Sequence, residues 1–167
     1  MICEFSYLWV QILTVKTMTT LKIGDQAPDF SVPDQDGNSI SLKDYKGKKL
    51  VLFFYPKAST PGCTAEACNL NDNYAKFQSQ GYEILGVSAD SQKRQQNFKN
   101  KYEFQYPLLA DEEKEVINAY QVWGPKKFMG REFDGIHRTT FVIDENGVIE
   151  DVIQKVKTKE HTAQILK

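Results

Sequence analysis

A short, unbroken apolar run limits how this chain can fold. Leu50–Tyr55 reads LVLFFY and is followed directly by Pro56. Six residues are long enough for one strand buried on both faces and too few for a typical helix. Proline cannot donate a hydrogen bond to a sheet, so the strand ends there. The run therefore predicts a buried central strand.

Strands and helices alternate along the rest of the chain. Apolar residues alternate with polar ones on both sides of an Asp36-Gly37 turn, which predicts a hairpin built on Phe30, Val32, Ile40 and Leu42. Further strands are predicted at Tyr82–Val87, Tyr106–Leu109, Thr139–Ile143 and Val148–Ile153. Helices are predicted from Thr60 to Gly81 and over Ser91–Tyr102, Glu112–Tyr120 and Lys159–Lys167. This order predicts an α/β fold, a central mixed β-sheet flanked by helices, with an N-terminal β-hairpin.

Composition excludes several function classes. A chain of 167 residues suits one domain, and its net charge of -1 gives no overall attraction to nucleic acid or an anionic membrane. No stretch approaches the ~20 apolar residues of a membrane-spanning helix. Three cysteines and two histidines make neither a secreted disulfide scaffold nor a zinc set. We expect no nucleic-acid, membrane or metal partner, and a reducing, cytoplasmic location.

The first 18 residues differ from the rest of the chain. Phe5–Val15 is apolar, but Glu4 precedes it, and neither a positive n-region nor a cleavage pattern indicates a signal peptide. We interpret residues 1–18 as an extension outside the fold and residues 19–167 as the folded domain, with Cys3 incidental. A signal peptide, an edge strand and a partner-binding tail are the alternatives.

Cys63 occupies a position that favours a reactive thiol. It follows the end of the buried strand, an edge of α/β sheets where chemistry is usual. Thr60 suits the N-cap of the next helix and Pro61 its first position, which makes Cys63 the third helical residue. Unsatisfied backbone N–H groups and the positive end of the helix dipole favour a thiolate there, and the thiolate is the nucleophile.

Cys68 is expected on a different face of the same helix. Cys63 shares the apolar face of Ala67 and Leu70, whereas Cys68 lies ~140° away by helix geometry. Their Cα atoms would be ~8.6 Å apart, and a disulfide rarely exceeds ~7 Å. A disulfide between them therefore requires the helix to unwind, which suits a redox cycle through a Cys63 sulfenic acid. Two inert core cysteines are the alternative.

The segment around Cys63 closely resembles the peroxiredoxins. Their signature Pro-x-x-x-Thr-x-x-Cys is met by Pro56, Thr60 and Cys63. Cys68, five residues further on, is similar to the Q-type subgroup, also called bacterioferritin comigratory protein. The resemblance covers essentially Leu21 to the C-terminus, including VLFFYPKASTPGCTAEAC and WGPKKFMGREFDGIHRTTFVIDENG.

The resemblance implies a thioredoxin-like fold and a monomer. It also implies reduction of hydrogen peroxide and organic hydroperoxides without metal, haem or flavin, with thioredoxin, or sometimes a glutaredoxin, as reductant. Cys63 would be the peroxidatic and Cys68 the resolving cysteine. Thr60 would bind the peroxide, and Pro56 would shield the pocket. Arg138 matches the active-site arginine, and a fixed cation there would stabilise a thiolate.

Other readings of the same residues stay open. The cysteine pair could serve a non-enzymatic thiol-switch binding module or holdase. A thioredoxin-type disulfide oxidoreductase is disfavoured because those proteins use Cys-x-x-Cys. A Cys–His hydrolase with His137 as base lacks a recognisable oxyanion motif.

Four further features receive structural readings. Glu66 is expected to complement the helix dipole, and His161 to face solvent on the final helix. Trp123, Phe128, Met129 and Phe133 lie among basic residues, and we interpret them as a loop packed beside the active site, not as a nucleic-acid stacking surface. Lysines at 155, 157 and 159 are expected on a solvated face.

Overall fold

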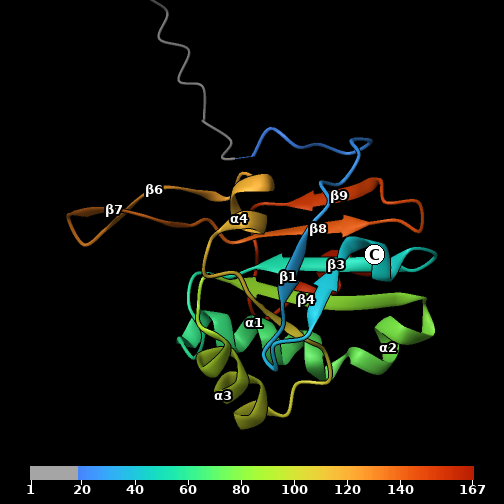
Figure 1. The fold of residues 1–167 in the computed structure, drawn as a ribbon, viewed down its shortest axis with the longest axis horizontal. Coiled ribbons are helices and arrows are strands. Elements are labelled where there is room, and N and C mark those ends of the chain that lie inside the picture. Colours follow the sequence, from blue (N-terminus) through green and yellow to red (C-terminus); the bar gives the residue numbers. More distant parts are fainter. Residues whose placement is uncertain (1–18) are drawn as a thin grey trace, which may run out of the picture.

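A five-stranded mixed sheet forms the centre of the molecule (Figure 1). The computed structural model describes residues 19–167, so the expectations for residues 1–18 and for Cys3 lie outside the described residues. The strand order is β5-β4-β3-β8-β9. The strands are β3 (Lys49–Phe54), β4 (Tyr82–Ser88), β5 (Leu108–Ala110), β8 (Thr139–Ile143) and β9 (Ile149–Ile153). β3, β4 and β5 run parallel, while β8 is antiparallel to both β3 and β9, which confirms the predicted mixed sheet.

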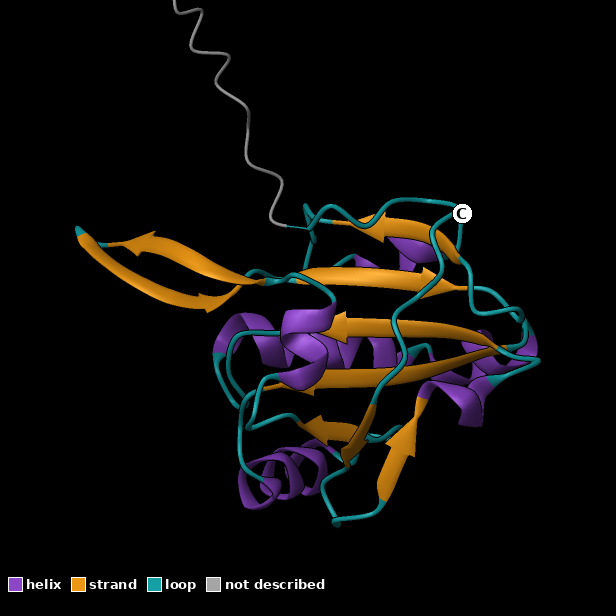
Figure 2. Ribbon diagram, turned by 45° about the horizontal axis from the view of Figure 1, so that its top comes forward, coloured by secondary structure: helices purple, strands orange, loops and turns teal. Residues whose placement is uncertain are grey.

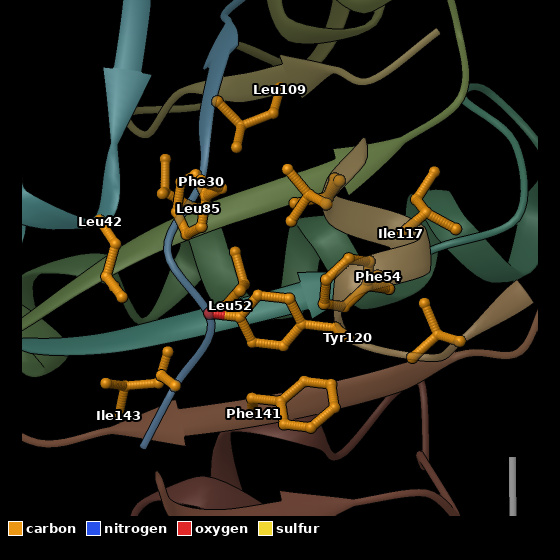
Figure 3. Close-up of a cluster of buried hydrophobic side chains, with 14 of the residues drawn as sticks. Phe30, Leu42, Leu52, Phe54, Leu85, Leu109, Ile117, Tyr120, Phe141 and Ile143 are labelled. Carbon is orange, nitrogen blue, oxygen red and sulfur yellow. The ribbon is translucent and has the colours of Figure 1, made fainter. Parts of the chain in front are cut away.

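The side chains of the apolar run in and directly after the central strand pack into two hydrophobic clusters, one on each face of the sheet. Leu52 and Phe54 point to one face of the sheet, where the hairpin of β1 (Ser31–Pro33) and β2 (Ser39–Ser41) and the helix α4 (Glu115–Ala119) cover them (Figure 3). Phe53 and Tyr55 point to the opposite face, against the other helices. Burying each such side chain contributes roughly 1.5–3 kcal/mol. The alternation explains why no polar residue interrupts the run.

The other helices lie mainly on the second face of the sheet. They are α1 (Pro61–Asp72), α2 (Tyr74–Ser79), α3 (Gln92–Tyr102) and α5 (His161–Ile165). The prediction of one helix from Thr60 to Gly81 is wrong, because the chain breaks at Asn73. The Asn73 side-chain amide donates to the Asn69 carbonyl at 2.8 Å, the acceptor that its own backbone N–H would use in a continuous helix. That N–H bonds Leu70 instead.

The N-terminal hairpin is confirmed, with one correction. β1 (Ser31–Pro33) and β2 (Ser39–Ser41) are antiparallel. Leu42 does not continue the second strand but begins the 3-10 helix η1 (Leu42–Tyr45). The backbone N–H of Ser41 donates to the carboxylate of Asp44 at 2.9 Å, which stabilises the start of this helix.

α4 and β5 begin later than predicted. The helix expected over Glu112–Tyr120 is shortened to α4, because the Asp111 carboxylate accepts the backbone N–H groups of Glu115 and Ile117. The strand expected over Tyr106–Leu109 begins at Leu108 as β5. Both shifts fall at element ends, where local pattern is weakest.

The aromatic and basic stretch is not a loop. β6 (Trp123–Phe128) and β7 (Arg131–Ile136) form a two-stranded hairpin that projects from the rest of the fold (Figure 2). Met129 and Gly130 both have positive φ, at 51° and 77°, as in the two-residue turns that match strand twist. Met-Gly is an unusual pair for such a turn, so the sequence did not indicate it. Met129 is 87% exposed at the tip.

Within residues 19–167, none of the helices combines the length and the apolarity needed to cross a bilayer.

Candidate active site

The site is built where β3 ends and α1 begins. Thr60 is extended and precedes Pro61, the first residue of α1, so the predicted helix start is confirmed. The Thr60 hydroxyl does not cap the helix but donates to the Lys57 carbonyl at 2.8 Å. It thereby tightens the loop that leads into the helix.

The loop before α1 has a second anchor that the sequence did not indicate. Asp90 Oδ2 accepts hydrogen bonds from the Ala58 backbone N–H and from the Ser88 hydroxyl, each at 2.7 Å. Asp90 follows the end of β4, next to β3 in the sheet. Ser59 lies in this loop with a φ of 65°, a region that side chains other than glycine rarely adopt. The anchors hold the loop in this conformation.

Cys63 points into the core, as the helical geometry predicted. Its side chain is 1% exposed and packs in the same cluster as Ala67, Leu70 and Phe77. Cys63 and Cys68 are both free thiols on the intact helix. Cys68 is half-buried at the margin of the same cluster, and burial, followed by the charge of Asp72, raises the pKa of its thiol.

Arg138 contacts Cys63 although the two residues are 75 positions apart in the sequence. It stands between β7 and β8, and its Nη2 donates to Cys63 Sγ at 3.3 Å. Its Nη1 donates to Glu66 Oε2 at 2.5 Å. A Cβ on Gly62 would lie 3.2 Å from Nη2, so the missing side chain at Gly62 leaves room for the guanidinium. The structure thus brings Arg138 and Cys63 together.

Glu66 is not an exposed partner of the helix dipole. It is fully buried on the inner face of α1 and bound to Arg138. Burial raises the pKa of its carboxyl to about 7, and the nearby guanidinium only partly opposes this. The expectation failed because pairing with Arg138 depends on a residue 72 positions away.

His161 does not face solvent. It is fully buried, and its Nε2 lies 2.7 Å from the Thr140 hydroxyl and 3.5 Å from Glu66 Oε1. α5 is fixed against α1, where Asn69 accepts the backbone N–H of Thr162 at 2.8 Å. A five-residue helix is too short for its buried face to show in the sequence.

Pro56 is half-buried and lines a hollow at the base of the β6–β7 hairpin, together with Trp123, Lys126 and Phe133.

His137 lies next to Arg138, but its ring forms a hydrogen bond with the Pro125 carbonyl at 3.0 Å. No hydrogen bond joins His137 to Cys63 in the described part of the chain, which gives no support to a Cys–His hydrolase. In the same residues, no group of three or more metal-ligating side chains is placed to hold an ion.

Comparison with known proteins gives consistent matches. The sequence model described as the AhpC/TSA family matches residues 23–152. The Peroxiredoxin Bcp of Escherichia coli K12 is 45% identical over 149 residues, covering 89% of this chain and 96% of the relative. The Peroxiredoxin Bcp of Bacillus subtilis 168 is 44% identical over 147 residues, covering 88% and 94%.

Solved structures give the same picture. A cysteine-to-serine variant of Xylella fastidiosa PrxQ superposes with a TM-score of 0.82 at 31% identity, covering 87% of this chain and 93% of that one. Xanthomonas campestris Bacterioferritin Comigratory Protein, studied for its alkyl peroxide reduction activity, matches with a TM-score of 0.78 at 33% identity, covering 89% and 94%. These matches confirm the predicted thioredoxin-like fold.

Proposed function

Since this chain belongs to the AhpC/TSA family, as a peroxiredoxin of the Bcp or Q-type group, we propose that Cys63 is the peroxidatic and Cys68 the resolving cysteine of a thiol-dependent peroxidase. Hydrogen peroxide and organic hydroperoxides are the proposed substrates. One observation carries the assignment of Cys63: a buried thiol at the start of a helix has a guanidinium 3.3 Å from its sulfur.

The first half of the proposed cycle is a nucleophilic attack. The Cys63 thiolate attacks one oxygen of the peroxide, so the S–O bond forms as the O–O bond breaks. The leaving alkoxide or hydroxide takes a proton and departs as alcohol or water, and Cys63 becomes a sulfenic acid. Arg138 stabilises the thiolate and the charge that develops on the peroxide oxygens. Thr60 and Pro56 are proposed to bind the peroxide and to shield the sulfur.

The second half consumes the sulfenic acid. Cys68 attacks Cys63 Sγ, a disulfide forms, and the sulfenic oxygen leaves as water. An external dithiol then reduces the disulfide by thiol–disulfide exchange. We propose thioredoxin for this step, with a glutaredoxin as the alternative, on the resemblance to the Q-type subgroup. The same resemblance supports a monomer, and three cysteines, too few for a secreted disulfide scaffold, support a reducing, cytoplasmic location.

α1 must unwind for this disulfide to form, and its present contacts oppose that change. The Tyr106 hydroxyl donates to the Ala67 carbonyl at 2.7 Å. The side-chain amide of Asn69 donates to the Lys159 carbonyl at 3.0 Å, and the Thr162 hydroxyl donates to the Asn69 carbonyl at 3.2 Å. The two bonds at Asn69 join α1 to α5 and to the turn just before it, so unwinding past Cys68 also releases α5.

The proposed function predicts catalytic peroxide turnover. Purified full-length protein, mixed with hydrogen peroxide, thioredoxin, thioredoxin reductase and NADPH, should oxidise many equivalents of NADPH per protein. Cumene hydroperoxide should also serve as substrate. No turnover with either peroxide, and with either thioredoxin or glutaredoxin as reductant, would overturn the proposal and favour a thiol-switch binding protein.

Disulfide mapping separates the roles of the cysteines. After peroxide treatment, mass spectrometry should find a Cys63–Cys68 bridge. Cys68→Ser should consume one equivalent of peroxide and then stop as a sulfenic acid. Cys3→Ser is the matched control and should turn over like the natural chain. A bridge between Cys63 and Cys3 instead would refute the resolving role of Cys68.

Oxidation is also expected to loosen α1 and α5 while sparing the sheet. Hydrogen exchange measured by mass spectrometry should show faster exchange over residues 61–72 and 161–165 in the disulfide form, because the bonds at Ala67 and Asn69 are lost. Peptides from β3 should exchange at the same rate in both forms. Equal protection of α1 in the two forms would contradict the unwinding.

A further inference from the structure

The buried carboxylate of Glu66 has one oxygen without a donor. Oε2 is bound to Arg138, but Oε1 has no hydrogen-bond partner within residues 19–167, and the residue is fully buried. Buried polar atoms are almost always paired, so an orphan oxygen of this kind calls for an explanation. The ring nitrogen Nε2 of His161 lies 3.5 Å from this oxygen.

The hydrogen bonds of His161 fix where its proton lies. Gln164 donates its amide to the Lys155 carbonyl and accepts the Lys157 backbone N–H on Oε1, each at 2.9 Å. Its Oε1 also lies 2.8 Å from His161 Nδ1, so Nδ1 must be the donor. In the neutral ring Nε2 is then unprotonated and accepts the Thr140 hydroxyl. It offers Glu66 Oε1 no donor.

The charges of the buried groups indicate that one additional proton is bound between Glu66 and His161. Ionised Cys63 and ionised Glu66 would be two buried anions held by one guanidinium, that of Arg138. Arg138 and His161 are the basic side chains within ion-pair distance of Glu66 in the described chain. A single proton, on Glu66 Oε1 or on His161 Nε2, makes the group of Cys63, Glu66, Arg138 and His161 neutral. Burial disfavours charge on both partners, which raises the pKa of Glu66 and lowers that of His161.

The other titratable groups around the site do not supply that proton. Tyr106 packs on α1, but its hydroxyl is committed to the Ala67 carbonyl, and burial raises its pKa strongly. Lys126 on β6 is a second cation close to Arg138 and Cys63, but its amine donates to the Ile136 carbonyl and forms no ion pair with Glu66. Burial also raises the pKa of the Cys68 thiol, which stays protonated.

We propose that His161 is a positioning residue that holds one proton jointly with Glu66 beside Arg138. While the proton is held, the guanidinium serves the Cys63 thiolate alone. When the proton is lost, Glu66 becomes a second anion and competes with the thiolate for Arg138. The inference rests on the proposed role of Cys63, and it couples α5 to the ionisation of the reactive thiol.

The two partners should have opposite effects when they are changed. Glu66→Gln removes the competing anion, so Cys63 should ionise at lower pH. In His161→Gln the amide nitrogen replaces Nε2 and donates permanently to Glu66 Oε1. Glu66 then ionises without the shared proton, so Cys63 should ionise at higher pH. Each shift should be roughly one pH unit, the scale of one nearby charge in a buried site.

Thiolate absorbance measured against pH tests this directly. A Cys3→Ser/Cys68→Ser background leaves Cys63 as the single thiol, because the chain has three cysteines. In the background protein, the curve of thiolate absorbance against pH should be broader than that of a single independent group, because Glu66 loses its proton over the same range. Glu66→Gln should restore the curve of a single group. His137→Gln removes the only other histidine and should leave the curve unchanged. A one-proton curve that neither Glu66→Gln nor His161→Gln moves would overturn the proposal.

A measurement on the natural sequence covers the case in which a variant fails to fold. NMR of protein labelled at glutamate Cδ and at the imidazole nitrogens should show Glu66 titrating near neutral pH, with His161 carrying its proton on Nδ1. A Glu66 carboxyl that is fully ionised down to pH 4, beside a neutral His161, would refute the shared proton. Neither measurement needs peroxide, so failure of the peroxidase assay and failure of this inference are separate results.

Discussion

Replacing Cys63 with serine should abolish peroxide turnover, with a loss of roughly 10³-fold or more, the scale on which removal of a nucleophile acts. A serine hydroxyl at this buried position is not ionised, and no other described thiol contacts Arg138. The side chain is nearly isosteric, so the fold should persist. The measurement is thioredoxin-coupled NADPH oxidation over a range of peroxide concentrations.

The second cysteine of α1 provides a matched control for this variant. Cys68→Ser removes a thiol from the same helix, yet it should still react once with peroxide, so a single-turnover assay distinguishes the two cysteines. Circular dichroism and thermal unfolding should show that Cys63→Ser is folded. Substantial turnover by folded Cys63→Ser would place the nucleophile elsewhere.

Replacing Arg138 with methionine should lower kcat/KM for peroxide by about 10²–10³-fold, as for the loss of one preorganised donor at a developing charge. The guanidinium is the group that donates to both Cys63 and Glu66. Without it, Cys63 should ionise at higher pH, and Glu66 should keep its proton because nothing offsets its burial. Stopped-flow measurement of the first oxidation step isolates this effect from reduction by thioredoxin.

Two variants make the Arg138 result specific. Arg131→Met removes an exposed arginine from β7 and should leave kcat/KM unchanged. Arg138→Lys keeps the charge but loses the two-pronged geometry, so it should fall between the natural chain and Arg138→Met. If Arg138→Met is folded and reacts with peroxide at the natural rate, the proposed role of the guanidinium is wrong.

The anchors of the site divide it into a fixed and a movable part. The loop before α1 is held by Asp90, which directly follows strand β4 of the central sheet. α1 itself is held by Tyr106 and by α5. Unwinding of α1 can therefore leave the loop and the sheet in place. This separation suits a cycle in which the sulfur must leave its pocket and return to it.

The amino-acid sequence alone determined the central strand, the start of α1 and the inward direction of Cys63. Each depends on residues close together in the chain: six apolar residues, the proline that ends them, and a helical period over one or two turns. The peroxiredoxin-like signature is equally local. The resemblance to the peroxiredoxins also predicted Arg138 as the active-site arginine, and the structure places its guanidinium at the Cys63 sulfur. The residues around Arg138 in the sequence do not by themselves indicate this contact.

The tertiary structure alone decided the roles of Glu66 and His161. Glu66 meets a guanidinium 72 residues away, and His161 meets a hydroxyl 21 residues away. Whether a carboxyl or an imidazole faces water or another charge depends on how α1, α5 and β8 pack. Ionisation follows burial and neighbouring charge, and both are properties of the assembled fold. The position of the reactive thiol was therefore readable in the sequence, whereas the proton balance around it was not.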